Sequence, residues 1–173
     1  MNKRKLFKIC LSALFAAVIC VSVVAIPVPL PGNGYFNLGD CFVIISALCL
    51  GPVWGGLAGS VGAALSDVVL GFGFYAPATF VIKWLMAVVV CLVYKAVTKN
   101  HRLRLLGLIL SSLLAELVMV GGYFVFEIFL FGLNVAAVDV IGNLIQGGCS
   151  IVAAVLIYSL LLKTGIIEKI FKK

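Results

Sequence analysis

Long apolar runs recur along the whole chain, and they constrain its fold more than any other feature. A helix of about 20 apolar residues crosses the hydrocarbon layer of a bilayer. Hydrophobic residues make up 64% of the chain and charged residues only 11%, whereas about a quarter of an average soluble domain is charged. A soluble fold of 173 residues cannot bury so much apolar surface in one core. The runs cover residues 6–26, 38–50, 53–70, 76–97, 105–131 and 138–162.

Turn-forming residues separate these runs and indicate separate helices. Gly71-Phe72-Gly73 and Gly132-Leu133-Asn134 interrupt the apolar sequence clearly. Gly51-Pro52 divides the second run from the third. Without a break there, residues 38–70 form one long kinked helix. The pattern with the break predicts an all-α integral membrane protein of six transmembrane helices, folded as a single domain over residues 1–173.

The distribution of positive charge tests the six-helix prediction. The chain carries a net charge of +7. Every Lys and Arg except Lys83 lies in the N-terminal tail, in residues 95–104 or in the C-terminal tail. Short loops rich in Lys and Arg stay in the cytoplasm, and only an even number of crossings puts all three segments there. We therefore expect both termini to be cytoplasmic and the protein to be multi-pass in a bacterial plasma membrane. No basic face with interleaved aromatic residues suggests nucleic-acid binding.

This topology brings most of the polar residues to one depth, in the outer half of the membrane. Ionisable residues inside a bilayer are costly and are functional candidates. Tyr123 and Glu127 are four residues apart, and Asn143 and Gln146 are three apart, so each pair shares one helix face. Amides both donate and accept hydrogen bonds, and aromatic rings stack on planar ligands. The predicted ligand-binding residues are Asn37, Asp40, Tyr75, Lys83, Tyr123, Glu127, Asn143 and Gln146.

Structural roles compete with ligand binding for several acidic residues. Asp67 and Lys83 flank one turn and can pair with each other across it. Asp40 can cap the helix that begins beside it. Asp139, at the expected outer start of the last helix, fits a solvated acid favoured by the helix dipole. Glu116 lies deeper and can bind a neighbouring helix.

Small residues mark two packing faces. Gly51, Gly55, Gly59 and Ala63 repeat every four residues, a pattern that lets another helix approach closely. We expect its partner to lie within this chain. Ala13 and Ala17 form a similar face on the first helix. Because that helix carries no polar pocket residue, we expect it to stand apart from the pocket. Its small-residue face fits contact with another protein or simple internal packing.

Five segments resemble a known family, the substrate-binding S components of energy-coupling factor (ECF) vitamin transporters. The likeness is greatest to the group with hydroxymethylpyrimidine- and pyridoxine-type members. The segments are GYFNLGD at 34–40, LGPVWGGLAGSVGAALSD at 50–67, YAPATFVIKW at 75–84, ELVMVGGYFVFE at 116–127 and GNLIQG at 142–147. Ala13 and Ala17 are similar to the coupling motif on the family's first helix.

The resemblance implies a subunit that binds a water-soluble vitamin at the outer side of the membrane. It also implies docking through the first helix onto a transmembrane coupling protein that is driven by two ATPase subunits. The chain has no P-loop sequence GxxxxGK[ST] with which to bind ATP itself. We expect a pyridoxine or hydroxymethylpyrimidine type of ligand, with riboflavin next.

Two other classes of function are less well supported by the residues. A stand-alone secondary transporter for a small metabolite, coupled to ions, would use Lys83 and the carboxylates as a relay. No inverted repeat of broken helices supports it. A membrane enzyme would need carboxylates at a catalytic spacing with a His or Cys nucleophile nearby, and no such set is present. We therefore expect no enzymatic activity, no cofactor and no metal site.

Overall fold

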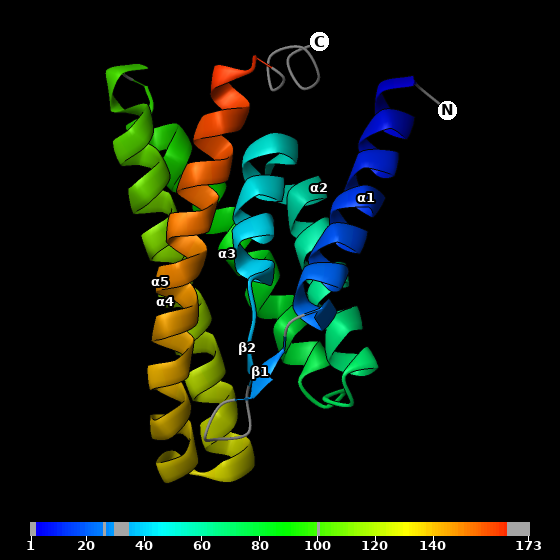
Figure 1. Cartoon of the computed structure of the whole chain (residues 1–173), viewed down its shortest axis with the longest axis vertical. Coiled ribbons are helices and arrows are strands. Elements are labelled where there is room, and N and C mark those ends of the chain that lie inside the picture. Colours follow the sequence, from blue (N-terminus) through cyan, green and yellow to red (C-terminus); the bar gives the residue numbers. More distant parts are fainter. Residues whose placement is uncertain (1–2, 26, 30–34, 100, 166–173) are drawn as a thin grey trace.

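Helices make up nearly all of the fold in the computed structural model, which describes residues 3–25, 27–29, 35–99 and 101–165 (Figure 1). Five helices in this part are long and apolar enough to cross a membrane. Gly34 of the first resemblance segment and the C-terminal lysines 169, 172 and 173 lie outside the described residues. The elements are α1 (Lys3–Ala25), β1 (Val28–Pro29), β2 (Tyr35–Phe36), α2 (Gly39–Val69), α3 (Ala76–Val97), η1 (His101–Leu103), α4 (Arg104–Phe131) and α5 (Leu133–Lys163).

The helix α2 reverses direction at Gly51. This glycine has φ 83° and ψ 179°, a backbone region that is nearly exclusive to glycine. The two halves then pack side by side (Figure 1): the Ser46 hydroxyl donates to the Gly55 carbonyl over 3.1 Å. The break expected at Gly51-Pro52 is therefore present as a chain reversal. The first half, residues 39–50, is about 18 Å long, and this is shorter than a membrane crossing.

The small-residue face of α2 packs inside the chain, as expected. A Cβ on Gly55 would lie 2.5 Å from the Ser46 carbonyl oxygen, and one on Gly59 would lie 2.9 Å from Val43. The main partner of the second half of α2 is thus its own first half. Gly62 extends this close approach to α1, because a Cβ there would lie 2.5 Å from the Ala16 carbonyl oxygen.

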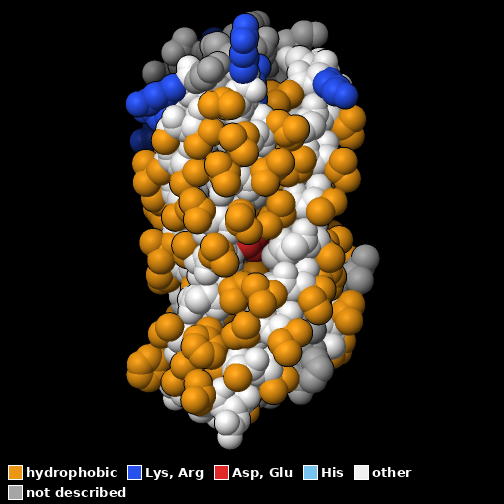
Figure 2. All heavy atoms as spheres, turned by 90° about the vertical axis from the view of Figure 1, so that its left-hand side faces the viewer, with side chains coloured by type: hydrophobic (Ala, Val, Ile, Leu, Met, Phe, Trp, Pro, Cys, Tyr) orange, Lys and Arg blue, Asp and Glu red, His pale blue; other side chains and the backbone are white. Residues whose placement is uncertain are grey.

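The two ends of the molecule differ in charge. The start of α1 and the end of α5 lie at one end of the helices, together with the turn between α3 and α4 (Figure 1). Lys and Arg side chains gather at that end, and apolar side chains cover the rest of the face seen in Figure 2. An acidic side chain shows through this apolar surface near mid-height. The opposite end carries the turns between α2 and α3 and between α4 and α5.

Two details of the fold differ from the expected one. The last helix begins at Leu133 rather than near Val138, because Gly132 alone makes the turn with φ 85° and ψ 169°. The segment between α1 and α2 also contains a two-residue antiparallel pairing, Val28 with Phe36 and Pro29 with Tyr35. Each helix packs mainly on its neighbour in sequence, and α5 closes the arrangement by contacting α2 and β2.

Candidate functional site

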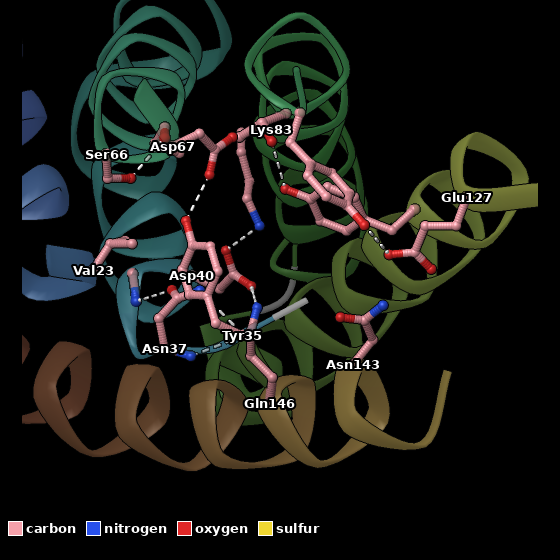
Figure 3. A pocket seen from close by; sticks show the side chains of 15 residues that line it. Val23, Tyr35, Asn37, Asp40, Ser66, Asp67, Lys83, Glu127, Asn143 and Gln146 are labelled. Atoms are coloured by element: carbon pink, nitrogen blue, oxygen red, sulfur yellow. Dashed lines mark hydrogen bonds and ion pairs between the residues drawn. The ribbon is translucent and has the colours of Figure 1, made fainter. Parts of the chain in front are cut away.

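A polar cavity of about 50 Å³ lies between the helices, next to β2. It draws side chains from β2 and from all five helices (Figure 3). All eight residues predicted to bind a ligand line this cavity, so the structure brings the whole set together. That they bind a ligand stays a prediction. The lining residues are Val23, Tyr35, Asn37, Gly39, Asp40, Ala63, Ser66, Asp67, Tyr75, Thr79, Lys83, Tyr123, Glu127, Asn143 and Gln146.

A buried ion pair forms the charged centre of the cavity. Lys83 Nζ lies 2.5 Å from Asp40 Oδ1, and the two side chains are 5% and 1% exposed. The Gln146 amide donates to the other Asp40 oxygen over 2.8 Å. Lys83 also lies over the ring of Tyr123, 5.2 Å from its centroid. Every charge in this centre is therefore compensated by a side chain of another helix.

This geometry decides against two of the structural alternatives. Lys83 pairs with Asp40 and not with Asp67 across the turn. Asp40 does not cap its own helix either, because the N-cap of α2 is Leu38 and no side chain caps it. One physical reason explains why the sequence left both alternatives open. A sequence gives the depth of a residue along a helix, but the packing of the helices decides which residues face each other.

Gln146 also holds the segment that precedes α2. Its Oε1 accepts hydrogen bonds from the backbone N–H of Asn37, over 2.9 Å, and from the Asn37 side-chain amide, over 3.2 Å. The Asn37 side chain in turn accepts a bond from the Gly39 N–H. Gln146 therefore joins α5, α2 and the segment between α1 and α2 through one side chain (Figure 3).

Tyr35 was not among the predicted residues, although it lies in the GYFNLGD segment. Its hydroxyl donates to Asp67 Oδ1 over 2.6 Å, and its ring contacts Phe72 with centroids 5.2 Å apart. Burial and the neighbouring Asp67 carboxylate raise the pKa of Tyr35, so this hydroxyl stays a proton donor. Tyr35 and Asp67 thus form a second polar pair on the cavity wall.

Other lining residues left a weaker signal in the sequence or none. Thr79 lies one helical turn before Lys83 on α3 and hydrogen-bonds with the Tyr123 hydroxyl over 2.9 Å; its spacing from Lys83 could have identified it. Val23, on α1, is apolar and gave no signal. Its position corrects the expectation that the first helix stands apart from the pocket. Nearer the start of α1, Ala13 and Ala17 are exposed.

Two groups in the cavity have hydrogen-bonding capacity that the described part of the chain does not use. Glu127 accepts a bond from the Tyr75 hydroxyl over 3.1 Å through Oε1, while its buried Oε2 has no partner among the described residues. The Asn143 side chain points into the cavity beside Glu127 (Figure 3) and makes no hydrogen bond to another described residue. Asn143 is only 8% exposed. These atoms are suited to a ligand.

Asp139 also differs from its expected environment. It is 1% exposed rather than solvated, because α5 begins at Leu133 and extends beyond it. Its carboxyl group interacts electrostatically with Glu127. Two buried acids, Glu127 and Asp139, therefore lie between α4 and α5, which the sequence did not suggest.

Tyr75 and Tyr123 form an aromatic wall at one side of the cavity, and phenylalanine rings pack behind Tyr75. Tyr75 lies at the centre of this group, with ring centroids 4.8 Å from Phe74, 5.4 Å from Phe126 and 6.1 Å from Tyr123. Such rings offer flat apolar surface beside polar groups. Together with the amides and carboxylates, they make a site for a planar ligand that has hydrogen-bonding edges.

Helices long enough to cross a membrane define a multi-pass membrane protein, and a buried cavity lined by polar residues lies between them. The family model of the ECF-type riboflavin transporter S component matches residues 3–163. The chain therefore belongs to this family, whose members are substrate-binding components of transporters and not enzymes. The expected family is confirmed, and the hydroxymethylpyrimidine or pyridoxine subtype stays a prediction.

Two individual proteins are also similar to this chain. A Pyrococcus woesei protein described as an uncharacterized protein in the gap 3' region is 34% identical over 137 residues, which cover 79% of this chain and 88% of that protein. A solved structure described as the S component of a bacterial ECF transporter has a TM-score of 0.66 and 19% identity. The match covers 94% of this chain and 98% of that one, and it shows that the fold is shared.

Proposed function

We propose that the protein captures a heteroaromatic vitamin at the outer face of the membrane and delivers it to an ATP-driven ECF module. The observation that carries this proposal is the cavity itself, which Asn143 and Glu127 both line and where the buried Glu127 Oε2 has no partner among the described residues. Buried polar groups without partners are costly, and a ligand that hydrogen-bonds to them removes that cost. Membership of the S-component family supports the same role.

The proposed topology has six crossings, with both termini in the cytoplasm. Two observations support it. The first observation is that the halves of α2 run in opposite directions, so that α2 counts as two crossings. The first half is short and begins at the cavity. Lys3, Lys5, Lys8 and Lys163 lie at the same end of the helices as the α3–α4 turn (Figure 1), which is the cytoplasmic end by the positive-inside rule. The cavity then lies nearer the outer side.

The charges of the cavity define the class of ligand. Asp40, Asp67 and Glu127 line it, and Lys83 is the only cationic side chain among the described lining residues. Asp40 already compensates this lysine. A phosphate or carboxylate on the ligand would meet acidic groups and no unpaired cation. The ligand should therefore be neutral or cationic and rich in hydroxyl or N–H donors.

Riboflavin is the first candidate, because the matching family is described by it. Its ring system has a flat apolar part for the aromatic wall and an imide edge that suits the amides. Its ribityl hydroxyls can donate to the carboxylates. The small volume of the cavity favours a ligand with one ring, which keeps pyridoxine and hydroxymethylpyrimidine as second candidates. Binding of riboflavin requires the cavity to widen.

Binding measurements on the purified chain test this proposal. The chain is titrated in detergent with riboflavin, its 5'-phosphate, pyridoxine and hydroxymethylpyrimidine. One unphosphorylated ligand should bind tightly, and riboflavin 5'-phosphate should bind at least about 100-fold more weakly than riboflavin, a difference of about 2.7 kcal/mol. Equal affinity for the phosphate would refute the charge argument. Binding of none of these ligands would refute the proposed ligand class.

Uptake by vesicles tests the transport role. Vesicles that hold this chain with an ECF coupling protein and its ATPases should accumulate the ligand only when ATP is supplied on the side of the membrane that carries the ATPases. Uptake by the chain alone, driven by an ion gradient, would instead identify a secondary transporter. Gly148→Ala is a control for substitutions on α5. Nothing lies within 4 Å of a Cβ at that position, so this variant should take up the ligand as the wild type does.

A further inference from the structure

Glu116 is a buried acid that the proposed site does not use. It lies on α4, is 3% exposed and does not line the cavity. Neither of its carboxyl oxygens has a hydrogen-bond partner among the described residues. It packs against Gly147 of α5, where an added Cβ would lie 3.3 Å from Glu116 Oε2. Such a residue is costly inside a membrane and calls for a functional explanation.

The charged neighbours of Glu116 are the two partners of the cavity ion pair. Its carboxyl group interacts electrostatically with Asp40 of α2 and with Lys83 of α3. Cys41 of α2 is a further titratable neighbour, and Tyr123 of its own helix faces the same lysine. On α5, Glu116 packs against Gly147, the neighbour of Gln146, whose uncharged amide donates to Asp40. Glu116 therefore belongs to a cluster of three ionisable side chains, Asp40, Lys83 and Glu116.

The charges of this cluster balance only if one acid is neutral. Asp40 contacts Lys83 directly and also accepts a bond from Gln146. Glu116 has no such stabilisation, and an ionised carboxyl group buried without partners is strongly unfavourable. Glu116 is thus the member that keeps its proton while Asp40 pairs with the lysine.

We propose that Glu116 is the reserve counter-ion of Lys83. When the donors of a ligand draw the Asp40 carboxylate away from Lys83, the Glu116 O–H bond breaks, the proton passes to water, and the remaining carboxylate pairs with the lysine. Lys83 then never stays buried without an opposite charge, a state that is strongly destabilising. The use of this reserve charge during ligand capture rests on the proposed function. The reserve charge itself does not, and it can be tested without any vitamin.

A double-mutant cycle on thermal unfolding tests the reserve charge. Asp40→Asn should lower the melting temperature moderately, because Glu116 then supplies the anion for Lys83, and Glu116→Gln should lower it little, because Glu116 is already uncharged and Asp40 remains. The double variant should lose far more than the sum of the two. Glu127→Gln is the matched control, since this buried acid on the same helix should combine additively with Asp40→Asn. Additive losses for Asp40→Asn with Glu116→Gln would overturn the proposal.

A third substitution covers the case in which the double variant does not fold. Adding Lys83→Met removes the charge that needs a partner, so the triple variant should recover expression and much of the melting temperature. A triple variant no better than the double one would overturn the proposal. Because no ligand is used, failure here is distinguishable from failure to bind a vitamin.

Infrared spectroscopy tests the proton directly. The wild-type protein should show the C=O stretching band of a protonated carboxyl group that is missing in Glu116→Gln and weakened in Asp40→Asn. Identical bands in the wild type and Glu116→Gln would overturn the proposal. Bound riboflavin should also weaken the band in the wild type. An unchanged band in protein that has bound riboflavin would overturn the ligand-driven step.

Discussion

Asn143 and Gln146 lie three residues apart on α5 and both face the cavity, yet the structure predicts different consequences when each is replaced. Asn143 has no hydrogen bond to another described residue, so Asn143→Ala removes no hydrogen bond within the described part of the chain. A ligand that bonds to this amide loses its partner in the variant. Loss of a buried hydrogen bond costs about 1–3 kcal/mol, which corresponds to an affinity roughly 5- to 150-fold weaker. The melting temperature should stay close to that of the wild type.

Gln146→Leu should affect both properties. The wild-type side chain makes three hydrogen bonds, one to the Asp40 carboxylate and two with Asn37. Leucine has a similar volume and leaves these groups without partners at about 1–3 kcal/mol each. Because such losses in one network are not additive and Asn37 can relax, we expect about 2–4 kcal/mol of lost stability. Ligand affinity should fall as well.

Two measurements on each purified variant decide the matter. Thermal unfolding in detergent, followed by intrinsic fluorescence, reports stability, and titration with riboflavin reports affinity. The wild type and Gly148→Ala serve as controls. If Asn143→Ala destabilises the protein as much as Gln146→Leu does, Asn143 has a structural role. If Asn143→Ala leaves affinity unchanged, it does not contact the ligand.

Three further predictions concern other parts of the molecule. Ala13→Trp should leave ligand binding intact and block ATP-driven uptake in vesicles. Leu160→Trp, an exposed control on α5, should allow uptake. Normal uptake with Ala13→Trp would exclude this docking face. Gly55→Ala should lower stability in thermal unfolding by about 1–3 kcal/mol, the usual cost of overpacking, because the new Cβ meets the Ser46 carbonyl; a melting temperature equal to that of Gly148→Ala would contradict this. Gly51→Ala meets no atom within 4 Å and should still cost about 1–3 kcal/mol from backbone strain, and an unchanged melting temperature would show that the reversal tolerates a side chain.

Much of this arrangement could be predicted because membrane depth is nearly one-dimensional. The lengths of the apolar runs and the positions of Lys and Arg set how far along each helix a residue lies. From depth alone, residues as distant as Asn37 and Gln146 could be assigned to one level. The structure places all eight predicted residues around one cavity for this reason.

Other features depend on how the helices face each other, and sequence patterns carry little information on that. Lys83 is at a similar depth to Asp67 and Asp40, and only packing decides that it pairs with Asp40. Val23 reaches the cavity although an apolar residue on an apolar helix gives no signal. Asp139 is buried because Gly132 alone makes the preceding turn, whereas the sequence predicted a longer interruption.

The order in which the helices contact each other has a consequence for synthesis of the protein. Helices α1 to α4 pack mainly on their neighbours in sequence, so each can find its partner as soon as it leaves the ribosome. The cavity is closed by α5, which supplies Asn143 and Gln146 and binds Asn37. A nascent chain that has not yet inserted α5 therefore lacks the cavity wall that Asn143 and Gln146 supply. Recognition of the vitamin becomes possible only in the last step of membrane insertion, and an incomplete chain cannot compete for the ligand.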